Sequence, residues 1–269
     1  MLRRAAWAGQ FYPSDSSALR AELQRLLAGA PAKEIAAPIG CVSPHAGYMY
    51  SGAIAADLYR RMQLPGRFVI LCPNHTGRGD SLAIMREGFW QTPLGDAPVD
   101  SALAARIMRH CPLLADDSEA HEEEHSLEVQ LPFLQFLKPE FSFVPIAIGQ
   151  DRFADLELLG HSLARAVRES EPRPLIIASS DMNHFETDER TRIKDRLAID
   201  RILALDPQGL YETVRRERIS MCGYAPATAM LVAALDLGAE SAELIRYGTS
   251  ADVTGDTTRV VGYAGIVVW

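Results

Sequence analysis

The sequence predicts an α/β fold: a single domain over residues 1–269 in which a mixed, mostly parallel sheet is flanked by helices. Three observations support this fold class. Short continuous apolar runs alternate along the chain with longer segments of helical periodicity, the pattern of strands joined by crossover helices. No Pro/Gly/Ser-rich linker or internal repeat divides the chain. With 269 residues and 48% hydrophobic composition, the chain is long enough to bury one large core.

The expected elements follow in order along the chain. Ser14 or Asp15 caps a first helix that runs to about Gly29, because leucines recur on one face of this segment. Apolar runs predict buried strands at 39–42, 68–72, 143–148, 175–178 and 260–268, with weaker candidates at 82–85 and 244–247. Helical periodicity predicts helices at 53–62, 101–110, 127–137, 156–167, 192–205 and 227–237. Residues 88–98 show neither pattern and are expected to form a surface loop.

Composition and charge argue against several classes of protein. The net charge of −8 opposes binding to a nucleic-acid backbone. No stretch approaches the roughly 18 uninterrupted apolar residues of a membrane span. The N-terminal segment lacks the apolar region of a secretory signal, so we expect a cytoplasmic protein. The four cysteines show no CxxC pairing, and reduced thiols are expected.

Three of the seven histidines stand just beyond the carboxyl ends of predicted strands. They are His45, His75 and His184, and each is flanked by turn-forming residues. In open α/β sheets, ligands bind beyond the carboxyl ends of the strands, so we expect these histidines to share a site. Imidazole serves both as a metal ligand and as a general base near neutral pH, and both uses stay open.

Cys222 adds a thiol just ahead of a predicted helix. Helix-end N–H groups and a nearby cation would lower the pKa of this thiol toward the metal-binding thiolate. Two imidazoles and one anionic ligand leave positions open for water, oxygen or substrate, as in a reactive metal site. The alternative role for Cys222 is that of a small, buried apolar side chain.

The segment HEEEH offers a competing interpretation. It matches H-E-x-x-H, in which His121 and His125 would bind zinc and Glu122 would act as the base of a metalloprotease. The surrounding residues are acidic, however, and apolar periodicity begins only at Leu127. We therefore favour a solvated helix start with one inward residue, His125 or Glu128.

Several motifs, taken in order, resemble those of the Memo family. They are AxxAGQFYP at 5–13, SPHAGYMYSG at 43–52, PNHTG at 73–77, EHSLEVQLPFLQ at 124–135, SSDMNHF at 179–185 and MCGYAP at 221–226. The resemblance runs from about Ala5 to the C-terminus. It implies a fold similar to the class III extradiol (LigB-like) non-haem iron dioxygenases.

The resemblance also implies a mononuclear metal site. The two histidines and one cysteine of the family's metal site match His45, His75 and Cys222, and its acid/base histidine matches His184. Asp181 matches a further position of the same pocket. Fe(II) or copper is the expected metal, with zinc also compatible. The dioxygenases have a carboxylate where this chain has a thiolate, so ring cleavage does not follow from the fold.

His125 and Glu128 are expected beside the pocket, His125 because it matches a family position there. The implied function is metal-dependent redox or oxygenase-type activity on a small-molecule or peptide ligand. The alternative is a peptide- or protein-binding module that uses the same pocket without turnover. The resemblance further implies an AMMECR1-like protein and a radical SAM enzyme as partners.

Overall fold

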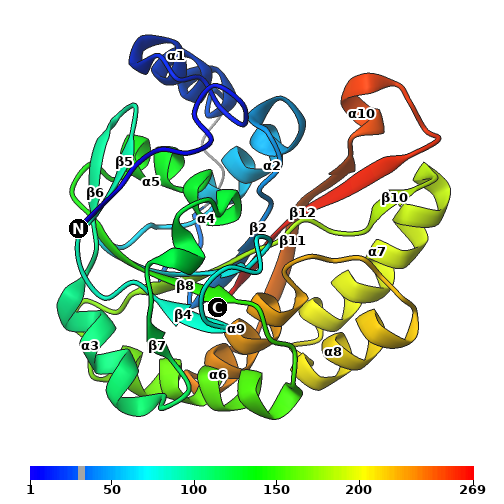
Figure 1. Ribbon diagram of the computed structural model, residues 1–269. Coiled ribbons are helices and arrows are strands. Elements are labelled where there is room, and N and C mark those ends of the chain that lie inside the picture. The colour runs from blue at the N-terminus through cyan, green and yellow to red at the C-terminus, as the bar shows by residue number, and fades with distance from the viewer. Residues whose placement is uncertain (30–33) are drawn as a thin grey trace.

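A mixed sheet lies between two layers of helices in the computed structural model, which describes residues 1–29 and 34–269 (Figure 1). Four neighbouring parallel strands form its centre: β2 (Gly40–Ser43), β9 (Leu175–Ser179), β3 (Arg67–Pro73) and β8 (Ser142–Ile148). The strands that extend it are β12 (Val260–Val268), β11 (Ala242–Thr249), β10 (His184–Glu186), β4 (Leu82–Ile84) and β7 (Ala115–Asp116). β12 is antiparallel to β2, and β4 is antiparallel to β8. The predicted mixed sheet is therefore confirmed, but it is not mostly parallel: among the described residues four of its strand pairings are parallel and four are antiparallel, because antiparallel strands are added on both sides of the parallel centre.

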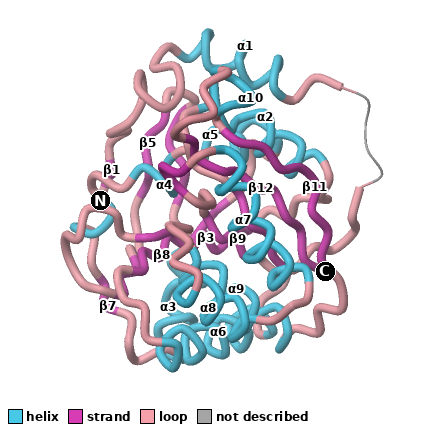
Figure 2. The backbone as a smooth tube through the Cα atoms, turned by 90° about the vertical axis from the view of Figure 1, so that its right-hand side faces the viewer, coloured by secondary structure: helices cyan, strands magenta, loops and turns pink. Residues whose placement is uncertain are grey.

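The helices fall into two groups. One face of the sheet carries α1 (Ser16–Leu26), α2 (Tyr48–Arg60), α4 (His125–Glu128) and α5 (Leu131–Leu137). The other carries α3 (Ser101–His110), α6 (Phe153–Arg168), α7 (Asp188–Leu203), α8 (Pro207–Arg216) and α9 (Tyr224–Asp236). Figure 2 shows this layering from the side, and the short α10 (Ala251–Thr254) follows β11. No helix in the described ranges has the length and apolar character needed to cross a bilayer.

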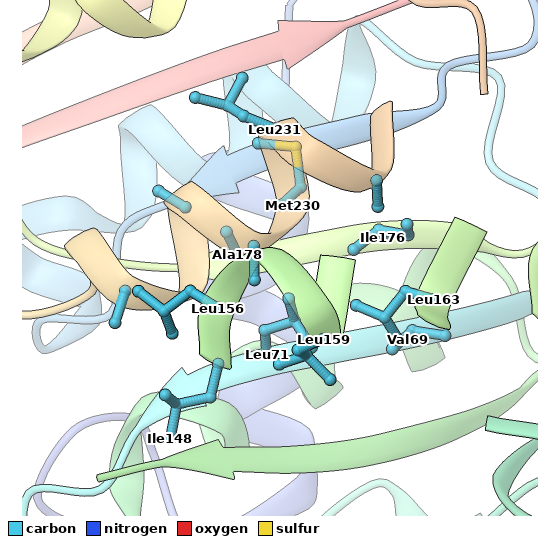
Figure 3. Packing of buried hydrophobic residues seen from close by; sticks show 14 of the residues in the cluster. Val69, Leu71, Ile148, Leu156, Leu159, Leu163, Ile176, Ala178, Met230 and Leu231 are labelled. Carbon is cyan, nitrogen blue, oxygen red and sulfur yellow. The ribbon is translucent and has the colours of Figure 1, made fainter. Parts of the chain in front are cut away.

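Buried side chains alternate between the two faces of the central strands. Val69 and Leu71 of β3 belong to the cluster under α6 and α9, whereas Phe68 and Ile70 belong to the cluster under α1, α2 and α5. Figure 3 shows the first cluster, in which Val69 and Leu71 pack near Leu159 of α6. Strands buried on both faces read as continuous apolar runs, which is why the sequence predicts them well.

The contact between α6 and α9 depends on a glycine, which gives a first prediction. A Cβ added at Gly160 would lie 2.6 Å from Val232 Cβ and 2.7 Å from the backbone oxygen of Ala229. We expect Gly160→Ala to destabilise the fold by about 1–3 kcal/mol through overpacking, although alanine is the better helix former. Urea unfolding measures this loss. Gly66→Ala is the control, because its Cβ would find only Glu140 O at 3.7 Å; an equal midpoint for both variants would contradict the prediction.

The expected surface loop at 88–98 is wrong. These residues form a hairpin of β5 (Phe89–Thr92) and β6 (Gly95–Pro98), and β5 also pairs with β1 (Leu2–Arg3) at the start of the chain. Trp90 is fully buried, with the Arg3 guanidinium 4.3 Å from its ring centre. These strands are too short to show a clear alternation of apolar and polar residues. In addition, β1, which pairs with β5, lies far away in sequence.

Two further helix predictions need correction. The helix expected at 127–137 is two helices, α4 and α5, because Pro132 in the first turn of α5 has no N–H to continue the hydrogen-bond ladder. Helix α8 was not predicted, although Asp206 caps it and Pro207 occupies its first turn. That pairing of cap and proline is a recognised helix start. By contrast, Asp15 caps α1 as predicted, through a hydrogen bond from Ala18 N.

Candidate metal centre

The carboxyl ends of the central strands bring the predicted site residues together. His45 follows β2, His75 follows β3, and His184 begins β10 after the loop that leaves β9. The turn before α9 places Cys222 Sγ 3.2 Å from His45 Nε2. The positions that the sequence analysis selected therefore lie on one edge of the sheet, as the strand order requires.

A cluster of three histidines lies at this edge. Ligand atoms of His45, His75 and His125 all lie within 4.8 Å of one another. His45 is buried and His75 is exposed, so the cluster runs from the interior to the surface. The ring of His125 stacks on that of His75 at 4.6 Å, while His45 lies edge-on to His75 at 5.4 Å.

A buried carboxylate fixes the orientation of His75. Glu124 Oε2 accepts from the backbone N–H of His75 at 2.7 Å, and Oε1 lies 2.8 Å from Nδ1 of its ring. Burial alone would raise the pKa of Glu124, but hydrogen bonds from His75 and Ser126 and the charge of His75 lower it to about 2. An ionised carboxylate only accepts, so Nδ1 of His75 carries a proton, and Nε2 is the ring nitrogen left to bind a metal.

Glu124 was not predicted as part of the site. It is one of three consecutive glutamates, and nothing in the sequence says which of them turns inward. The structure buries Glu124 completely and leaves Glu122 and Glu123 exposed.

The buried side chain of His45 faces the half-buried thiol of Cys222. Burial and the charge of nearby His75 lower the pKa of His45 well below its usual value, so its ring is a neutral donor of a lone pair. Burial, with the carboxylate of Asp181 beside it, raises the pKa of the Cys222 thiol. Within the protein itself, desolvation outweighs the helix-end N–H groups, so the predicted lowering of this pKa depends on the nearby cation.

His184 stands at the wall of an adjoining cavity. Its Nδ1 lies 2.8 Å from the carbonyl oxygen of Ser220, which can only accept, so Nδ1 donates and Nε2 is free. The cavity has a volume of about 300 Å³ and is lined by Phe11, Tyr50, Asp181 and His184 among others. Asp181 also accepts from the backbone N–H of His45 at 2.8 Å, which ties this wall to the histidine cluster.

The zinc-protease geometry of HEEEH is not formed. The segment is a 3-10 helix (Glu119–His121) followed by a turn, and α4 begins only at His125. His121 is fully buried with its ring 5.7 Å from that of Trp90, and it is not in the group that His125 joins. The two histidines therefore do not present their rings from one helical face.

Burial of His121 corrects the expectation of a solvated segment. Neither ring nitrogen has a hydrogen-bond partner within residues 1–29 and 34–269. Burial, and then the positive charge of Arg3, lower the pKa of His121 to about 4. This imidazole is an uncharged part of the core at neutral pH.

Glu128 is inward as expected, but its role is to anchor the N-terminal segment. It forms a buried ion pair with Arg3 and accepts from Tyr12 Oη. It also accepts from the backbone N–H groups of Ala6 and Trp7, each at 3.0 Å.

The anchored segment forms an aromatic wall on the histidine cluster. The rings of Phe11 and Trp7 lie 4.6 Å and 5.6 Å from that of His125. Glu128 therefore supports the site indirectly, because it anchors the segment whose Trp7 and Phe11 rings pack against His125.

These features define an α/β protein with a histidine-rich pocket at the carboxyl ends of its parallel strands. A family model described as Memo-like protein matches residues 3–267. A MEMO1 family protein of Methanosarcina mazei is 45% identical over 269 residues, covering 99% of both chains. A MEMO1 family protein of Methanothermobacter thermautotrophicus is 42% identical over 280 residues, covering 98% of this chain and 99% of that relative. The chain belongs to the Memo family.

Proposed function

We propose that this protein binds one metal ion through His45, His75 and Cys222, and that His184 exchanges a proton with a ligand in the adjoining cavity. The observation that carries the proposal is that possible ligand atoms lie close together. Those of His45, His75 and His125 lie within 4.8 Å of one another, and Cys222 Sγ lies 3.2 Å from His45 Nε2. Fe(II) or copper suits this donor set of two imidazoles and a thiolate, and zinc is also compatible.

The protonation pattern of the cluster fits a metal. Nδ1 of His75 is held by Glu124, and Nδ1 of His45 lies 2.9 Å from Ser179 Oγ. Metal-binding histidines characteristically use one nitrogen for the metal and the other for such a hydrogen bond. Both rings therefore offer Nε2 to the same space.

Cys222 lies outside the group of ligand atoms within 4.8 Å that the three histidines form, so its choice as the third ligand rests on its contact with His45 and on the stacking of His125. Ligands of one ion converge on it with their donor edges, but His125 presents its face to His75 at an interplanar angle of 24°. We therefore infer that His125 stacks on a ligand and lines the open side of the centre. The cluster of three histidines is the competing ligand set, and the test below separates the two.

The cavity residues support a role in proton transfer. Free Nε2 of His184 accepts a proton from a bound ligand, while Asp181 holds the loop of His45 through its backbone N–H. A redox-active ion would supply electron transfer beside this pocket. The mixed sheet and the place of the site also support a common architecture with class III extradiol dioxygenases, which we include in the proposal.

Metal titration tests the proposal. Metal-free protein is loaded anaerobically with Co(II), Fe(II), Cu(I) or Zn(II), and about one equivalent is expected to remain after desalting. The Co(II) form is expected to show a thiolate charge-transfer band that Cys222→Ser removes and His125→Ala keeps. Stoichiometric Co(II) binding without a thiolate band in the wild type, retained in Cys222→Ser and lost in His125→Ala, would assign the three-histidine set. Absence of stoichiometric binding by all four metals would refute the proposal.

A further inference from the structure

A buried glutamine, Gln130, lies behind His45 and outside the cavity. It stands between α4 and α5 and is 1% exposed. Its side chain makes four hydrogen bonds: Nε2 to Pro44 O at 3.0 Å, Nε2 to Ser179 Oγ at 2.8 Å, and Oε1 from Ser43 Oγ at 2.9 Å and from Tyr59 Oη at 2.7 Å. All four hydrogen-bonding positions of the amide are used.

Two of these partners end neighbouring strands. Ser43 is the last residue of β2 and Ser179 the last of β9, and the two are paired in register. Gln130 therefore bridges the ends of the two strands at the point where the chain turns toward His45.

The network determines where each proton lies. Because the carbonyl of Pro44 only accepts, the amide nitrogen of Gln130 must face it, and that nitrogen then also donates to Ser179 Oγ. Ser179 has one hydroxyl proton, which it donates to the carbonyl of Ser126 at 2.6 Å. Its oxygen can then only accept from Nδ1 of His45, 2.9 Å away.

The tautomer of His45 follows from these assignments. With Nδ1 donating to Ser179, the ring keeps its lone pair on Nε2, the atom that faces Cys222 Sγ. The opposite tautomer would need the Ser179 proton and would leave the buried carbonyl of Ser126 without its donor, at a cost.

We propose that Gln130 is a positioning residue for the metal centre: acting through Ser179, it fixes the tautomer and orientation of His45. The inference rests on the proposed function for its consequence, metal affinity, but its structural content concerns the metal-free protein. Gln130 itself touches neither metal nor ligand.

A double-mutant cycle that measures metal affinity tests whether Gln130 acts on His45 through Ser179. Gln130→Met and Ser179→Ala are each expected to weaken Zn(II) or Co(II) binding roughly 10- to 100-fold, the usual effect of losing such a supporting hydrogen bond. Because Gln130 acts through Ser179, the double variant is expected to bind no more weakly than the weaker single variant. Gln135→Met is the matched control, since Gln135 lies within α5, shortly after Gln130 in sequence, but bonds to Gly95 and Thr92. Wild-type affinity in Gln130→Met, or multiplied effects in the double variant, would overturn the proposal.

Histidine ¹⁵N NMR of the metal-free protein gives a readout that does not require metal binding. The wild-type spectrum is expected to show His45 protonated at Nδ1, with the signal assigned by its loss in His45→Ala. Protonation at Nε2 would refute the inference even if metal binds. Protonation at Nδ1 in a chain that binds no metal would support the inference and refute the proposed function, so the two failures are distinguishable.

Discussion

Replacing both His45 and His75 by alanine is expected to abolish metal binding. Wild-type protein should retain about one equivalent after loading and desalting, and the double variant should retain only background, because two of the three proposed ligand side chains are gone. Elemental analysis by mass spectrometry measures the difference. Because His45 is buried and hydrogen-bonded to Ser179, circular dichroism is used to check that the variant still folds.

The control for this experiment is His161→Ala. His161 lies on α6 and pairs with Asp236 on the surface, at 2.7 Å. The His161→Ala variant should retain the full metal content. Equal metal content in the His45/His75 variant and the wild type would mean that the metal binds elsewhere.

Loss of the Glu128 carboxylate is expected to destabilise the whole protein. Glu128→Gln leaves the Arg3 guanidinium buried without its counter-charge, since their side chains are 0% and 3% exposed. Breaking a buried ion pair at one end typically costs about 3–5 kcal/mol. The variant should therefore show a much lower urea midpoint, and protease sensitivity should appear first in the N-terminal segment.

An exposed pair provides the matched comparison. Glu22 bonds Arg25 on α1, but Arg25 is 67% exposed, so Glu22→Gln should change stability by less than about 1 kcal/mol. A similar small change in Glu128→Gln would show that the N-terminal segment is not held by this carboxylate. Loosening of that segment should also free the rings of Trp7 and Phe11 from His125, a change visible in tryptophan fluorescence.

The central sheet could be predicted because its signals are local. Each of its strands is a short apolar run, and burial on both faces makes such runs continuous. The β5–β6 hairpin and its pairing with β1 could not be predicted, since two- to four-residue strands carry little pattern. Trp90 packs there against Arg3, which is distant in sequence.

The candidate site likewise contains residues that could be predicted from the sequence and residues that could not. His45, His75 and His184 could be found because each follows an apolar strand, and parallel strands bring their carboxyl ends to one edge. The inward turn of Glu124 could not be found, because it stands among other acidic residues of the same kind.

The sequence by itself determined the fold class, the strand-end histidines and, through its ordered motifs, the family. Only the tertiary structure decided which side chains support them: Glu124 behind His75, Gln130 and Ser179 behind His45, and Glu128 under the N-terminal segment. The physical reason is separation along the chain. Arg3 meets Glu128 across 125 positions, and Gln130 meets Ser179 across 49, so no local pattern records these contacts. A buried polar side chain must find partners wherever the fold places them.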